Sequence, residues 1–258
     1  MKITQISAGA VLVAASILLI AAITSSAQVG AAPNQVAEGD KPFLLTYPNL
    51  EDPDGEVVLT NDHVVLQRLV VGAGEWEGIH SHPGNQIYVH IKGGVWSGRL
   101  GGKSEYSDVF SPDGEVGWMD AIPLSAGHDS GNTGETPIDL IYVTLKGEAP
   151  IAPEVEHAPQ TYPGIPLELV LENDWMIVQR VQVEPGQWTG SHSHPGNQVY
   201  IHIKGGTWSE RRRGVKSGNS TISETGSVGW IDAVDPGEAH DVGNTGDTTI
   251  DLVLVTLK

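Results

Sequence analysis

The chain has 258 residues, no cysteine and a formal net charge of −18. So strong a negative charge argues against binding to nucleic acid or to an anionic membrane surface, since both require cationic patches. The lack of cysteine excludes disulfides, thiolate nucleophiles and cysteine-bound metals. The 32 glycines and 16 prolines favour a turn-rich β protein over a helical one.

The N-terminal segment has the pattern of an export signal. Residues 8–23 are apolar apart from Ser16, and small residues up to Ala27 offer a signal-peptidase site. We therefore predict a signal peptide over 1–27, a flexible leader over 28–41, and a secreted or periplasmic protein. The apolar run is slightly short for a spanning helix of about 20 residues. An uncleaved N-terminal anchor is the alternative.

The remainder of the chain consists of one pattern repeated once. With an offset of 112, residues 61–146 align without a gap to 173–258, and 46 of these 86 positions are identical. An internal repeat of this length predicts two domains of the same fold. We place them at 42–146 and 162–258, joined by a linker over 147–161 that is rich in Pro, Glu and Ala.

Each copy alternates short apolar runs with turn signals. In the first copy, strands are predicted over residues 64–71, 85–91, 95–97, 116–121 and 138–145. Outside the signal segment, no stretch has a convincing helical period. Short strands with this regular spacing predict an all-β sandwich or small barrel in each copy.

Eight of the ten histidines occupy matching positions in the two copies: His80, His82, His90, His128, His192, His194, His202 and His240. Residues two apart on a strand face the same side. An unbroken strand would therefore direct His80, His82, Gln86, Tyr88 and His90 inward together. The Pro83-Gly84 pair instead favours a turn or bulge at this point. An HxH pair with a distant third histidine, present twice, predicts a metal site in each copy, although buried or surface histidines without metal are the alternative.

The spacing of these residues resembles the two sequence motifs of the cupin family. The first motif is a glycine, five residues, His-x-His, a glutamate and a second glycine. It is matched, with glutamine for glutamate, by Gly74, His80, His82, Gln86 and Gly93, and by Gly186, His192, His194, Gln198 and Gly205. The second motif is matched in part by Gly117, Pro123, His128 and Asn132, and by Gly229, Gly237, His240 and Asn244.

The resemblance covers nearly all of the chain after the signal segment. It implies a bicupin, in which two tandem jelly-roll (double-stranded β-helix) barrels each hold one divalent metal ion. The ligands it implies are His80, His82, His128 and Gln86 in the first barrel, and His192, His194, His240 and Gln198 in the second.

The two glutamines depart from the family pattern. An amide oxygen coordinates weakly and carries no charge, so a divalent ion would keep a charge of about +2 and favour an anionic substrate. Since neither copy has the motif's carboxylate, we expect both sites to be locally positive. Gln86 and Gln198 would alternatively bond a metal-bound water beside a three-histidine site. By analogy with three-histidine cupin dioxygenases, we favour iron, with Ni, Cu, Mn or Zn as alternatives.

The candidate catalytic side chains continue the ligand strand: Tyr88, His90, Tyr200 and His202. They would line a pocket or relay protons, although filling of the barrel interior explains them equally well. The favoured function is a metal-dependent oxidoreductase of dioxygenase type that acts on a small organic molecule. The alternatives are a non-catalytic module for a small ligand or carbohydrate, and a redox-neutral isomerase, lyase or decarboxylase. The sequence does not predict the oligomeric state.

Overall fold

The computed structural model describes residues 36–147 and 158–258, except residues 195 and 235. The predicted signal peptide, the leader up to residue 35 and most of the predicted linker lie outside the described residues. Among the helices within these ranges, none is both long and apolar enough to cross a membrane.

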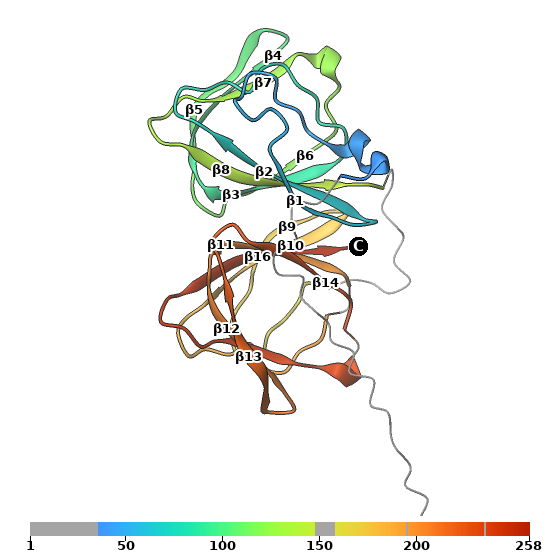
Figure 1. The fold of residues 1–258 in the computed structure, drawn as a ribbon, viewed down its shortest axis with the longest axis vertical. Helices are drawn as coiled ribbons and strands as arrows, with labels where there is room; N and C mark the ends of the chain where they lie inside the picture. Colours follow the sequence, from blue (N-terminus) through green and yellow to red (C-terminus); the bar gives the residue numbers. More distant parts are fainter. Residues whose placement is uncertain (1–35, 148–157, 195, 235) are drawn as a thin grey trace, which may run out of the picture.

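Nearly all the regular structure is β-strand (Figure 1). The first half contains η1 (Glu38–Phe43), β1 (Glu56–Thr60), β2 (Val64–Val71), β3 (Gln86–Lys92), β4 (Gly94–Leu100), β5 (Lys103–Ser111), β6 (Val116–Met119), η2 (Leu124–Ala126), β7 (His128–Asn132) and β8 (Ile138–Leu145). The second half contains β9 (Glu168–Glu172), β10 (Met176–Val183), β11 (Gln198–Lys204), β12 (Gly206–Arg212), β13 (Val215–Ser223), β14 (Val228–Ile231), η3 (Pro236–Glu238), β15 (Asp241–Asn244) and β16 (Ile250–Leu257).

Both halves have the same sheet topology. The first half forms a five-stranded sheet, β1-β2-β8-β3-β6, and a three-stranded sheet, β5-β4-β7. The second half forms β9-β10-β16-β11-β14 and β13-β12-β15 in the same pattern. The strands pair antiparallel, and neighbours that are distant in sequence, such as β2, β8 and β3, are typical of a jelly roll. The expected all-β class with two tandem jelly-roll barrels is confirmed.

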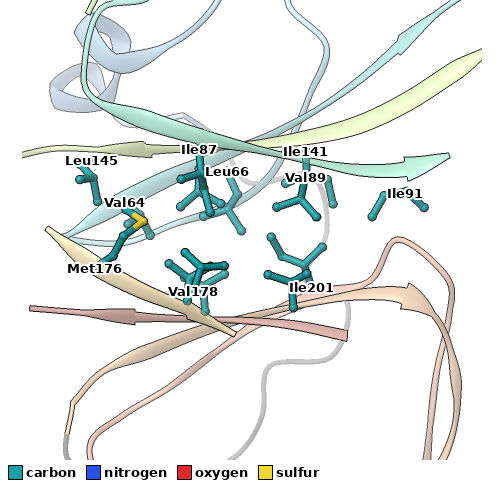
Figure 2. Packing of buried hydrophobic residues seen from close by; sticks show 14 of the residues in the cluster. Val64, Leu66, Ile87, Val89, Ile91, Ile141, Leu145, Met176, Val178 and Ile201 are labelled. Carbon is teal, nitrogen blue, oxygen red and sulfur yellow. The ribbon is translucent and has the colours of Figure 1, made fainter. Parts of the chain in front are cut away.

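The five-stranded sheets of the two barrels pack face to face. The side chains of Ile87, Val89 and Ile91 on β3 point toward the second barrel. There they pack in one cluster with Val178 and Ile201 (Figure 2). Each fully buried Val or Ile contributes about 1.5–3 kcal/mol to folding. Strand β2 is therefore buried on both faces, since Val64, Val65 and Leu66 in succession are all buried. The sequence predicts a linker between the domains but does not reveal this shared core.

Contacts between the barrels are reciprocal. The guanidinium of Arg68 lies against Gly226, and that of Arg180, its counterpart at the offset of 112, lies against Gly114. Arg68 also donates two hydrogen bonds to Asp139, at 2.9 and 2.6 Å, and Arg180 makes the same pair with Asp251. Reciprocal use of matching residues indicates an approximate two-fold axis between the barrels.

Candidate metal centres

The HxH pair lies outside strand β3. The unbroken-strand alternative is wrong, because β3 begins only at Gln86, after a break that contains the Pro83-Gly84 pair. His80 instead pairs with His128, and the His80 amide donates to the His128 carbonyl at 3.1 Å. His192 and His240 pair in the same way. Backbone pairing of segments far apart in sequence thus brings the third histidine to the HxH pair.

His128 begins β7, a strand that the sequence pattern does not predict. Its sequence, HDSGN, has no β-branched residue, and its Asp-Ser-Gly-Asn composition is typical of a turn. The strand forms because it pairs with β4 along its whole length, from Trp96–Asn132 to Leu100–His128. Tertiary pairing has here overridden local propensity.

In each barrel, three imidazoles converge. The sets are His80, His82 and His128, and His192, His194 and His240; within each set the ligand atoms lie within 4.8 Å of one another. Two Nε2 atoms of the first set are 3.0 Å apart, and two pairs in the second set are 2.9 and 3.1 Å apart. Two nitrogens that each lie about 2.1 Å from one ion at right angles are about 3.0 Å apart. Both sets could therefore hold a metal ion.

The protonation state of these rings also suits a metal. Burial lowers the pKa of His80 to about 4 and that of His82 to about 3. Burial likewise lowers the pKa of His192 and of His194 to about 4. A metal binds only the neutral imidazole. At neutral pH, these four rings are ready to bind without losing a proton.

Hydrogen bonds at Nδ1 orient the first histidine of each set. His80 Nδ1 donates to the Gly78 carbonyl at 2.8 Å, and His192 Nδ1 donates to the Gly190 carbonyl at the same distance. With the proton at Nδ1, the lone pair of Nε2 points toward the other imidazoles. Gly78 adopts φ 81° and Gly190 φ 77°, which disfavour a side chain.

The motif glutamine of the first barrel contacts a ring rather than the centre of the set. Gln86 Oε1 accepts a hydrogen bond from His82 Nδ1 at 2.8 Å, and Gln86 Nε2 donates to Thr144 at 3.3 Å. The two roles expected from the sequence, ligand and partner of a metal-bound water, stay predictions. The geometry makes Gln86 a residue that positions His82.

The corresponding pair in the second barrel is looser. Gln198 Nε2 donates to Thr256 at 2.8 Å. Its Oε1 and His194 Nδ1 are both buried without a hydrogen-bond partner of normal geometry among the described residues. The Gln198 amide nevertheless opposes the burial that lowers the pKa of His194. Gln198 therefore lies near His194 but holds it less tightly than Gln86 holds His82.

The candidate catalytic residues lie on the inward faces of β3 and β11, the strands that follow the two HxH pairs. Trp96 Nε1 donates to His90 Nε2 at 3.0 Å, and the Tyr88 and His90 ring centroids are 5.3 Å apart. The second barrel repeats these contacts, with distances of 3.0 and 5.4 Å, among Trp208, His202 and Tyr200. His90 and His202 belong to neither set of converging imidazoles. Their catalytic role stays a prediction.

Sequence reasoning missed a carboxylate beside the first set. Glu77 is fully buried, and neither of its oxygens has a hydrogen-bond partner of normal geometry in the described part of the chain. Its Oε2 lies 3.7 Å from His80 Nε2. Burial and the charge of Asp129 raise the pKa of Glu77 well above its usual range, against a smaller opposite effect of Ser130.

With a metal bound, an ionised Glu77 would offset part of the positive charge that we expect at the first centre. Its position lies between the glycine and the HxH pair, where the family motif leaves the residue type free. The sequence offered one signal for Glu77, a difference between the two copies. Thr189 occupies the position that matches Glu77 in an otherwise similar stretch.

Tyrosines surround the first set of histidines. The Tyr47 ring lies 4.8 Å from that of His80, and the Tyr142 ring 5.8 Å from that of His82. In the second barrel, Tyr162 lies 4.3 Å from His192, but Leu254 takes the position of Tyr142. The space beside the histidines is therefore more polar in the first barrel than in the second.

Comparisons with known proteins give a fold but no family. No family model and no curated protein matches the sequence. The structure is similar to AerE from Microcystis aeruginosa, with TM-score 0.56 and 14% identity over 84% of this chain and 99% of that chain. It is also similar to a mutant of salicylate 1,2-dioxygenase from Pseudoaminobacter salicylatoxidans, with TM-score 0.50 and 11% identity over 78% of this chain and 75% of that chain.

A cupin 2 conserved barrel domain protein from Leptotrichia buccalis gives TM-score 0.44 and 14% identity over 78% of this chain and 86% of that chain. At these identities, the likenesses bear on the fold alone. The likenesses to AerE and to the salicylate 1,2-dioxygenase mutant agree with the expected all-β fold of two tandem barrels. Each barrel also has three histidines that could hold a metal.

Proposed function

We propose that this protein is a bicupin metalloenzyme that oxidises a small organic molecule with O2. The observation that carries the proposal is the convergence of three neutral imidazoles in each barrel. Three histidines occupy only part of the coordination shell of iron or a related metal, which leaves positions for O2 and substrate. The likeness to salicylate 1,2-dioxygenase supports this reaction class by analogy of fold.

Bound iron would supply the activation of O2, and residues of the chain would prepare its site. The Gly78 carbonyl and the Gln86 side-chain oxygen accept hydrogen bonds from Nδ1 of His80 and of His82. These bonds direct both Nε2 lone pairs to the same point. The buried rings of Tyr47 and Tyr142 exclude water on one side. The substrate that we propose is a small organic molecule bound at the positions that the histidines leave open.

Metal content together with oxygen uptake tests this proposal. We expect the anaerobically reconstituted protein to hold two metal ions per chain. His82→Ala and His194→Ala would each remove one of them, whereas His63→Ala, away from both sets, would remove none. A correctly folded protein that takes up no transition metal after reconstitution would refute the proposal.

The buried carboxyl of Glu77 favours one second candidate, a redox-neutral isomerase, lyase or decarboxylase. A carboxyl with a raised pKa can donate or accept a proton during such a reaction. Oxygen uptake separates the two candidates, because turnover without O2 consumption would support the redox-neutral reaction. We also propose that the predicted export signal over residues 1–27 directs the protein to the periplasm or the outside of the cell, and N-terminal sequencing of the mature protein would check its removal.

A further inference from the structure

The two barrels differ in the residue that precedes the HxH pair by three positions. The backbone is the same at both places, since the Glu77 amide donates to the Ser130 carbonyl and the Thr189 amide to the Val242 carbonyl, each at 2.8 Å. The Thr189 hydroxyl has polar partners within 3.3 Å, including Asp241 and the Val242 carbonyl. Equivalent backbone positions therefore carry a satisfied hydroxyl in one barrel and an unsatisfied carboxyl in the other.

An ionised carboxylate without a partner is strongly unfavourable in a protein interior. Glu77 is fully buried, and the Lys and Arg ion pairs found in the described ranges do not include it. A metal ion bound by the neighbouring histidines would supply the missing cation, and its charge would keep Glu77 ionised despite the burial.

The position of the carboxylate agrees with this role. Glu77 Oε2 is 3.7 Å from His80 Nε2, the nitrogen that faces the other imidazoles. Two ligand atoms that each lie about 2.1 Å from one ion are separated by about 3.0–4.2 Å, depending on the angle between them. The carboxylate oxygen and the imidazole nitrogen therefore lie at the spacing of two ligands of a single ion.

We infer that Glu77 is an anionic ligand of the metal in the first barrel and replaces the carboxylate that the motif position, Gln86, lacks. The first barrel then has three histidines and a carboxylate, and the second has three histidines alone. This inference rests on the proposed metal binding. Hard cations such as Mn²⁺ prefer carboxylate oxygen, so the first barrel binds Mn²⁺ more tightly than the second.

Mn²⁺ titration of the metal-free full-length protein tests the inference, with calorimetry and electron paramagnetic resonance as readouts. The His194→Ala background isolates the first barrel, and the His82→Ala background isolates the second. We expect Glu77→Gln and Glu77→Thr to weaken Mn²⁺ binding by the first barrel at least tenfold and to change its resonance spectrum. The threonine variant uses the residue that the second barrel accommodates at this position. Thr189→Val is the matched control and would leave the affinity of the second barrel unchanged.

Thr189→Glu adds a gain-of-function arm, with tighter Mn²⁺ binding by the second barrel as the expected result. If the Glu77 variants bind Mn²⁺ with wild-type affinity and spectrum, the inference is overturned while metal binding by the histidines stands. If neither isolated barrel binds any transition metal, the proposed function itself fails. Melting of the metal-free Glu77 variants, expected at or above the wild-type temperature, verifies that they fold.

Discussion

The two barrels hold their histidines in the same way but surround them differently. Both use a backbone bridge between two segments, His80–His128 or His192–His240, and a glycine carbonyl to orient the rings. Around this frame, the first barrel places Glu77, Ser130 and Tyr142 where the second has Thr189, Val242 and Leu254. The backbone thus preserves ligand geometry in both copies, while neighbouring side chains decide charge and polarity. The copies are two candidate centres with different chemistry.

The difference extends to the fourth matching histidine of each barrel, His90 and His202. His90 Nδ1 lies 3.9 Å from Glu115 Oε2, whereas its counterpart His202 has the Ser227 hydroxyl 3.2 Å from Nδ1. Glu115 and Ser227 occupy matching positions. The first barrel again carries the acidic side chain, so the two barrels differ in charge at this position as well.

The largest expected effect separates the barrels by activity. His82→Ala should abolish turnover and remove one metal ion per chain, because it destroys the centre that has the carboxylate. His194→Ala should remove the other ion yet keep most of the turnover. Metal analysis and oxygen uptake check both variants side by side. Equal loss of activity in the two would contradict the asymmetry.

A mutation in the shared core should affect both barrels at once. Ile87→Ala and Ile201→Ala each remove a fully buried side chain from the cluster between the sheets. We expect each to lower the free energy of unfolding by about 2–5 kcal/mol. Denaturant unfolding should show a single transition in both variants. Ile222→Ala is the control, since Ile222 is 67% exposed and its loss should have little effect.

The glutamines should differ in importance. Gln86→Leu removes the acceptor that holds His82 and should weaken metal binding by the first barrel about 10–100-fold. Gln198→Leu should have a smaller effect, because Gln198 Oε1 makes no hydrogen bond of normal geometry among the described groups. Competition with a chromogenic chelator measures both. If Gln198→Leu weakened metal binding as much as Gln86→Leu or more, the hydrogen bond between Gln86 and His82 would not explain the effect of Gln86.

The smallest effect concerns the pH dependence of stability. Burial lowers the pKa of His90 and of His202 to about 4, from 6.5 for the exposed ring. Below pH 6.5 the unfolded chain takes up protons that the folded chain does not, so stability falls as the pH drops toward 4. We expect His90→Gln or His202→Gln to reduce this loss by about 1–3 kcal/mol. Unfolding measured at pH 7 and pH 4.5 checks the difference, and an unchanged acid sensitivity would contradict it.

Part of the centre could be read from residue spacing, and part could not. The repeated HxH pair and the third histidine marked the converging imidazoles, because few patterns other than ligation place three histidines at matching positions twice. The alternation along β3 also predicted that Gln86 and His90 share a face. Glu77 escaped notice because its importance depends on the absence of partners, and burial without partners is visible only in three dimensions.

By itself, the sequence determined the all-β class, the duplication and the six converging histidines, because periodicity, turn residues and ligand spacing are local properties of the chain. Only the tertiary structure decided that the five-stranded sheets share one core, that Gln86 bonds to His82, and that a buried carboxylate lies beside the first set. The shared core depends on contacts between segments far apart in sequence, and apolar alternation permits many such pairings. The Gln86–His82 and Glu77–His80 contacts join near neighbours in the chain, but they depend on the turn and the burial that the tertiary structure imposes there. The physical difference between the barrels arises from those contacts.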